Sequence, residues 1–185
     1  MCINLLIVDD EYYCVENLKM KIEKRSKEFQ TIFCAYSLKQ ALEYISSKNI
    51  SIMICDIEMP GGSGLELLNC IRNKKLNTIC IFLTAYAKFE YVSQALKLSS
   101  LDYLLKPVED EQLFSALDRA LSQYRQQQQS LLNTIHADYW KENRLYLLEL
   151  FWMDLLENTI SDKHDGILQE LSFRKLDPAL AEVPY

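Results

Sequence analysis

Short apolar runs divide the first two thirds of the chain, and amphipathic segments lie between them. Four strong apolar runs occupy residues 3–8, 51–55, 78–83 and 101–105, and a weaker run occupies residues 31–36. Apolar runs of this length are typical of strands buried on both faces, as in a parallel sheet. Between the runs, apolar residues recur at helical spacing, as at Leu38, Leu42 and Ile45. Five strands alternating with helices predict a doubly wound α/β fold over residues 1–122.

Beyond residue 122 the pattern changes to one long helical stripe. Residues 108–165 contain no Gly or Pro, and glutamine fills residues 126–129. The apolar residues of the stripe, interrupted around Asp138 and Glu142, are Leu113, Leu117, Leu121, Tyr124, Leu131, Ile135, Leu145, Leu148, Trp152 and Leu155. Such a stripe needs a covering surface. Residues 123–185 are therefore expected to be a helical extension, either a coiled coil or a helical hairpin folded on itself, that begins a longer downstream region.

Composition narrows the classes of function mainly by exclusion. The chain of 185 residues has 20 Lys and Arg against 26 Asp and Glu, and a net charge of −6 argues against unaided binding of nucleic acid. No apolar run approaches the roughly 20 residues that span a bilayer, and no basic leader precedes Asp9, so no membrane association is expected. The six cysteines form no CxxC pair. Together these features favour a reduced, cytoplasmic protein.

Charged and polar residues stand at the carboxyl ends of four predicted strands. Asp9 and Asp10 follow the first strand, Asp56 the third, Thr84 the fourth and Lys106 the fifth. In an open parallel sheet these ends meet at one edge, where ligands bind. Converging carboxylates repel one another unless a cation neutralises them, and oxygen ligands without Cys or His favour Mg²⁺. The alternative, that each acid only caps a helix, explains one Asp well but not the whole set.

These residues belong to four sequence blocks that together resemble the receiver domain of two-component response regulators. The blocks, in chain order, are LIVDDE at residues 6–11, CDIEMP at 55–60 with Gly64, LTA at 83–85, and YLLKP at 103–107. The resemblance covers residues 1–122. It implies a flavodoxin-like sheet of five parallel strands in the order 2-1-3-4-5.

The resemblance also implies a role for each acid. Asp56 matches the aspartate that accepts a phosphoryl group from a histidine of a sensor kinase. Asp10 matches the principal Mg²⁺ ligand and Asp9 its neighbour, and the backbone carbonyl of Glu58 would be a further ligand.

The remaining positions match residues that switch conformation or control the phosphoryl group. Lys106 would pair with Asp56 and later with a phosphoryl oxygen, aimed by a cis bond to Pro107. Thr84 would bind a phosphoryl oxygen, and Tyr103 would swing inward behind it. Glu58 and Tyr86, two residues beyond Asp56 and Thr84, would control the access of water.

From these positions we expect a phosphorylated lifetime of minutes or longer. The glycine-rich residues 61–64 match neither a Walker loop nor GxGxxG and are interpreted as a mobile turn, with Gly64 opening the next helix.

The tail sequences YWKENR and FWMDLL resemble the region that follows the receiver in response regulators with an AraC-type helix-turn-helix output. This implies a transcription regulator whose DNA-binding domain lies outside these residues. The expected partners are a sensor histidine kinase and a second copy of the chain. The chain is expected to be a signalling domain and not an enzyme in its own right.

Two alternatives stay open at this point. One is a pseudo-receiver that dimerises without phosphorylation. The other is an Mg²⁺-dependent phosphatase of the haloacid dehalogenase type, which is disfavoured because its nucleophile lies on the first strand whereas Asp56 ends the third.

Overall fold

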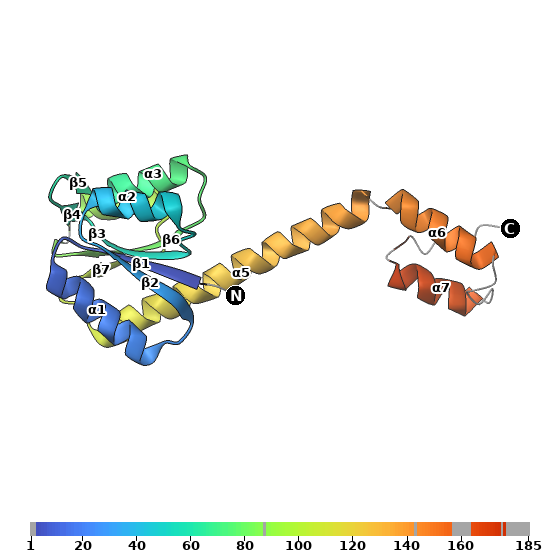
Figure 1. Cartoon of the computed structure of the whole chain (residues 1–185), viewed down its shortest axis with the longest axis horizontal. Coiled ribbons are helices and arrows are strands. Elements are labelled where there is room, and N and C mark those ends of the chain that lie inside the picture. The colour runs from blue at the N-terminus through green and yellow to red at the C-terminus, as the bar shows by residue number, and fades with distance from the viewer. Residues whose placement is uncertain (1–2, 87, 143, 157–163, 175, 177–185) are drawn as a thin grey trace. The chain divides into compact units, whose positions relative to one another are not determined.

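A computed structural model describes residues 3–86, 88–142, 144–156, 164–174 and 176. The chain divides into two compact units, residues 1–126 and 127–185. The first unit holds a central sheet with helices on both faces (Figure 1).

The sheet of the first unit has five parallel strands in the order β2-β1-β3-β6-β7, which confirms the predicted topology. The strands are β1 Ile3–Val8, β2 Phe29–Ala35, β3 Ile52–Asp56, β6 Ile79–Thr84 and β7 Asp102–Leu105. Every residue of β3 and β6 is buried, as continuous apolar runs predict. β2 lies at one edge and leaves Gln30 and Thr31 exposed, which explains its weaker apolar signal.

Five helices cover the sheet in two groups. They are α1 Tyr12–Arg25, α2 Leu38–Ser47, α3 Gly64–Asn73, α4 Phe89–Lys97 and α5 Asp110–Glu142. α1 and α5 pack on one face, and α2, α3 and α4 pack on the other (Figure 1). Each face has its own buried apolar cluster, so the sheet lies between two hydrophobic cores. The strand ends, where the predicted site lies, are therefore held from both sides.

The glycine-rich segment after β3 is more ordered than a simple turn. Two-residue strands, β4 Glu58–Met59 and β5 Gly62–Ser63, pair antiparallel to form a small hairpin. α3 then begins at Gly64, as predicted. Ser63 caps it: the Ser63 hydroxyl accepts from Leu65 N–H at 3.1 Å, and the Glu66 carboxylate accepts from Ser63 N–H at 3.3 Å. This reciprocal cap fixes the start of α3 close to Asp56.

Arg72 joins α3, α4 and the start of β6 at the opposite end of the sheet. Its guanidinium donates to four backbone carbonyls: Nε to Leu98 at 3.0 Å, Nη1 to Leu76 at 3.3 Å and to Thr78 at 2.9 Å, and Nη2 to Ser99 at 3.2 Å. Partial burial lowers the pKa of Arg72 from its usual value. One side chain thus binds carbonyls of the loop that follows α3 and of the residues that follow α4.

The free energy of unfolding of an Arg72→Met variant is expected to be about 2–4 kcal/mol lower than that of the wild type. Four backbone carbonyls lose their charged hydrogen-bond donor in this variant. Urea denaturation followed by far-ultraviolet circular dichroism measures the loss. Lys74→Met is the matched control, since Lys74 is exposed and its side chain donates, among the described residues, only to Ser46 Oγ at 3.0 Å. Equal stability of the two variants would contradict the assigned role of Arg72.

The second unit contains α6 Arg144–Leu156 and α7 His164–Phe173, as well as the C-terminal part of α5. α6 and α7 pack together around a small apolar core of Phe151, Leu155, Ile167, Leu171 and Leu176. Arg174 reinforces it by binding Asp154 at 2.6 Å and Glu170 at 2.8 Å. A helical tail was predicted, and part of its apolar stripe is covered by α7. The domain boundary at residue 122 and the coiled coil stay predictions.

Among the described residues, no helix combines the length and the apolar character that crossing a membrane requires.

Candidate functional site: an acidic pocket at the carboxyl ends of β1 and β3

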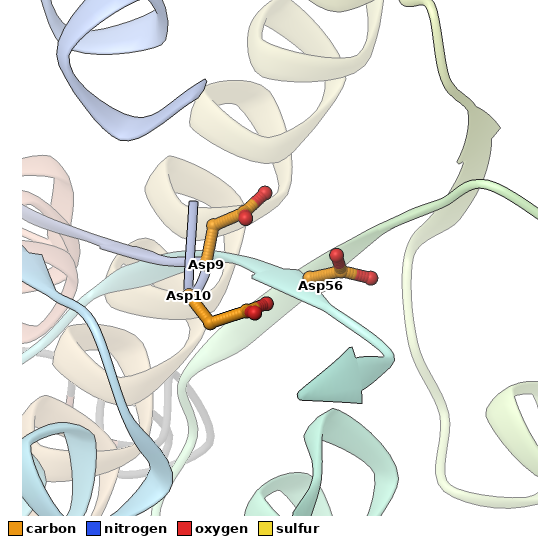
Figure 2. A group of neighbouring side chains, drawn as sticks. All are labelled: Asp9, Asp10 and Asp56. Atoms are coloured by element: carbon orange, nitrogen blue, oxygen red, sulfur yellow. The ribbon is translucent and has the colours of Figure 1, made fainter. Parts of the chain in front are cut away.

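Three carboxylates converge at one edge of the sheet, as the strand ends predicted. Asp9 and Asp10 follow β1, and Asp56 is the last residue of β3; Figure 2 shows their side chains entering one region. One carboxylate oxygen from each lies within 4.8 Å of the other two. Asp9 and Asp56 are buried, and Asp10 is exposed. Buried acids this close together require positive charge nearby.

Lys106 supplies positive charge from the end of β7. Its Nζ is 2.6 Å from Asp9 Oδ2 and 2.6 Å from Asp56 Oδ2, so one ammonium bridges both buried acids. The Lys106–Pro107 bond is cis, as predicted, and Lys106 N–H donates to the Thr84 carbonyl at 2.8 Å. Lys106 is therefore fixed by the neighbouring strand β6.

The pKa values of Asp9 and Lys106 reflect both burial and the ion pair between them. Burial raises the pKa of Asp9, although hydrogen bonds from Lys106 and from Glu11 N–H partly oppose the rise. Burial disfavours the charge on Lys106, but its hydrogen bonds to Asp56 and Asp9 outweigh burial and raise its pKa. Lys106 is thus held as a cation at neutral pH. No described side chain pairs with Asp10, which leaves its oxygens open to solvent.

The backbone around Asp56 is held at three points. Asp56 Oδ1 accepts from Glu58 N–H at 3.2 Å. Ile57 N–H donates to Leu83 O at 3.2 Å, and Gly64 N–H donates to Ile57 O at 2.9 Å. Gly64 lies so close that a Cβ built on it would be 2.1 Å from the carbonyl oxygen of Asp56. The start of α3 therefore packs directly on the residue that carries the acid.

Thr84 and Tyr103 meet at the backbone of Tyr86. The buried Thr84 hydroxyl accepts from Tyr86 N–H at 3.2 Å and donates to Tyr86 O at 3.4 Å. The Tyr103 hydroxyl donates to the same carbonyl at 2.7 Å. Burial raises the pKa of Tyr103. The two predicted switch residues are thus linked through Tyr86, whose own side chain is about half exposed, 52%.

Sequence reasoning missed two residues at the rim of the site, Lys88 and Tyr91. Glu58 Oε1 accepts from Lys88 Nζ at 2.7 Å and from the Tyr91 hydroxyl at 2.6 Å. Both hydrogen bonds lower the pKa of Glu58, and the one from Lys88 contributes most. A Glu two residues after the acid and a Lys–x–x–Tyr at the start of α4 are individually common, so only the structure reveals that they meet.

The fold and the site define a class: a doubly wound domain whose buried Asp, flanked by further acids, Thr and Lys, lies at the carboxyl edge of the sheet. Residues 5–118 match the family described as "Response regulator receiver domain". The chain belongs to this family of two-component signalling domains, which confirms the resemblance. The alternative of a haloacid dehalogenase-type phosphatase is thereby set aside.

Curated relatives and solved structures agree with this assignment. The chain is 33% identical over 134 residues to "Sensory transduction protein LytT" of Bacillus cereus, covering 72% of this chain and 52% of that protein. It is 37% identical over 124 residues to "Transcriptional regulatory protein HptR" of Staphylococcus aureus, covering 67% of this chain and 48% of that protein. The chain therefore spans about half the length of these relatives.

Two solved structures give the same picture. A DNA-binding response regulator of the LuxR family from Staphylococcus aureus matches with a TM-score of 0.60 and 28% identity, covering 64% of this chain and 98% of that one. A CheY-like receiver domain from Methanospirillum hungatei matches with a TM-score of 0.63, 24% identity and coverage of 69% and 99%. The second likeness supports the fold alone.

Proposed function

We propose that the chain is a phosphorylation-controlled switch in which Asp56 accepts a phosphoryl group from a histidine of a sensor kinase. The observation that carries the proposal is the Asp56 carboxylate, buried, bridged by Lys106 at 2.6 Å and within 4.8 Å of Asp9 and Asp10 oxygens. A carboxylate is a competent nucleophile toward phosphorus when the charge of the phosphoryl oxygens is neutralised.

In the transfer step, an Asp56 oxygen attacks the phosphorus of phosphohistidine. The P–O bond forms as the P–N bond breaks, and the released imidazole takes up a proton. Lys106 pairs with the carboxylate before transfer and with a phosphoryl oxygen afterwards, which keeps its charge at the reacting group throughout. The Thr84 hydroxyl breaks its hydrogen bonds to the Tyr86 backbone and then donates a hydrogen bond to another phosphoryl oxygen.

Three carboxylates without His or Cys ligands fit a hard divalent cation such as Mg²⁺. Asp9, Asp10, Asp56 and the backbone carbonyl of Glu58 would hold it. Bound there, it supplies positive charge to the phosphoryl oxygens. Asp10 contributes most directly, since its carboxylate has no partner among the described residues and faces solvent.

The output of the switch extends beyond this unit. Rearrangement of Thr84 and Tyr103 alters the face formed by α4, β7 and α5, and α5 continues without Gly or Pro into the second unit. We propose that this change controls homodimerisation and, through an AraC-type DNA-binding region outside these residues, transcription. Relatives named as transcriptional regulators support this role. The chain acts in the cytoplasm, where its kinase partner presents phosphohistidine.

The test is incubation of the chain with a small phosphodonor and Mg²⁺, followed by intact mass. We expect one phosphoryl group per chain, no uptake when EDTA removes the cation, and decay over minutes or longer once the donor is removed, with Glu58 and Tyr86 limiting the access of water. Absence of uptake from every donor and from any kinase would favour the pseudo-receiver instead, whereas loss within seconds would contradict only the slow decay.

A further inference from the structure

Glu58, Lys88 and Tyr91 form a polar cluster, here called the latch, that joins the hairpin after β3 to α4. Lys88 Nζ and the Tyr91 hydroxyl both donate to Glu58 Oε1, at 2.7 and 2.6 Å, and Lys88 Nζ is 3.3 Å from the Tyr91 hydroxyl. We propose that Lys88 and Tyr91 are positioning residues: they hold Glu58 and so oppose the rearrangement that follows occupation of the acceptor site. This inference rests on the proposed function.

One side of the latch reaches the acceptor directly. The backbone N–H of Glu58 donates to Asp56 Oδ1 at 3.2 Å, while its side chain is held by α4. Glu58 therefore touches the acceptor carboxylate through its backbone and the helix through its carboxylate. A phosphoryl group on Asp56 must be accommodated beside a residue whose side chain is tied elsewhere.

The other side of the latch restrains the segment between β6 and α4. Thr84 exchanges two hydrogen bonds with the backbone of Tyr86, and these must break before Thr84 can reach a phosphoryl oxygen. Lys88 lies two residues further on, and its Nζ is 4.8 Å from the Tyr86 ring centroid. Movement of Tyr86 away from Thr84 is therefore resisted by two sets of contacts. The hydrogen bonds to Thr84 hold Tyr86 on one side, and Lys88, while it stays bound to Glu58, holds it on the other.

Apart from the ring of Tyr91, which packs against the core cluster on this face of the sheet, few apolar contacts hold the described residues at this end of α4. Lys88 occupies the N-cap position of α4, but its side chain makes no capping bond. Ala95, two turns later, is the buried residue of the helix, and Phe89 is 84% exposed. Local stability is low where apolar contacts are few. The latch is accordingly the main described polar contact between the first turn of α4 and the site.

The consequence follows from the reciprocity of coupled equilibria. If the latch stabilises the arrangement with an empty acceptor, breaking it must favour the arrangement with an occupied one by the same factor. The side chains of Lys88 and Glu58 are 47% and 36% exposed, so solvent screens their attraction. We therefore expect an effect of about three- to fivefold, at or just below the low end of typical coupling.

The experiment titrates the full chain with beryllofluoride, which stands in for the phosphoryl group, at saturating Mg²⁺. Amide NMR signals of the segment from Thr84 to Tyr91 report the midpoint. Lys88→Met and Tyr91→Phe are expected to lower the midpoint about three- to fivefold, and Lys88→Arg should restore it.

The matched controls are Lys97→Met, exposed on the same helix, and Tyr44→Phe, a tyrosine packed on Phe33. Both controls should keep the wild-type midpoint. A merely structural role of Lys88 and Tyr91 would lower the melting temperature without moving the midpoint.

The outcomes separate the two proposals. The latch is overturned, and the proposed function left intact, if the wild-type chain binds beryllofluoride but the latch variants have the same midpoint as the controls or a higher one. A wild-type chain that shows no response overturns the proposed function and, with it, the latch. Lower midpoints in both latch variants but not in the controls support the inference.

Discussion

An Asp56→Asn variant is expected to take up no phosphoryl group and, at the same time, to be more stable than the wild type without Mg²⁺. Uptake is lost because a carboxamide is a poor nucleophile and cannot form the acyl phosphate. Intact mass after incubation with phosphodonor and Mg²⁺ measures this. Uptake that persists at another residue would show that Asp56 is not the acceptor.

The gain in stability comes from relieving repulsion. In the wild type, Asp56 shares Lys106 with Asp9, and the Asp10 carboxylate lies nearby. Removing one charge leaves Lys106 fully paired with Asp9, so no buried charge is orphaned. We expect the free energy of unfolding to rise by about 1 kcal/mol. Saturating Mg²⁺ should shrink the difference, because the cation stabilises the wild type by binding its folded state.

Asp118→Asn is the matched control for this prediction. Asp118 is exposed on α5 and far along the chain from the acidic pocket, yet the substitution changes the net charge equally. It should leave both phosphoryl uptake and Mg²⁺-dependent stability unchanged. A control that gained as much stability as Asp56→Asn would attribute the gain to overall charge and not to the pocket.

A Gly64→Ala variant is expected to lose about 3 kcal/mol of stability. The added Cβ would lie 2.1 Å from the Asp56 carbonyl oxygen and 2.8 Å from Cys55 Sγ, both well inside van der Waals contact. Because the closer atom belongs to the backbone, relief requires the start of α3 to move away from β3. The usual preference of helices for Ala over Gly, about 1 kcal/mol, is too small to compensate.

The same displacement should slow phosphoryl uptake, since Asp56 is the residue pushed. Gly61→Ala is the instructive control: nothing lies within 4 Å of its added Cβ, but its φ is +79°. Its cost is conformational, about 1 kcal/mol, and it should leave uptake unchanged. Thermal and urea denaturation of both variants, with uptake rates, test the distinction. Similar effects of the two substitutions would argue against steric contact at Gly64.

The fold could be predicted because its strands are buried on both faces. β1 was predicted with its observed bounds, and β6 was displaced by one residue because Thr78 is buried but does not belong to the strand. The start of edge strand β2 was predicted two residues late, since Gln30 and Thr31 face solvent, and its end one residue late. The hairpin of β4 and β5 was not predicted, because strands of two residues have no period to detect.

The site was predictable to the level of which residues meet, but not how they bind one another. Strand ends gather at one edge whatever the side chains are, so the convergence of Asp9, Asp10 and Asp56 follows from topology. The bridge by Lys106 depends on side-chain geometry, and the latch joins residues 30 and 33 positions apart in the chain. Such contacts leave no periodic trace in a single sequence.

Arg72 gives the two ends of α4 different mechanical roles. Its planar guanidinium binds the carbonyls of Leu98 and Ser99, which fixes the C-terminal end as a pivot. A nine-residue helix is about 14 Å long, so a turn of about 10° around that pivot carries the first residue by about 2 Å. Phe89 lies at the end of α4 far from this pivot, and Leu98 lies at the pivot itself. A tilt of α4 therefore displaces Phe89 most, while the apolar surface near Leu96 moves very little.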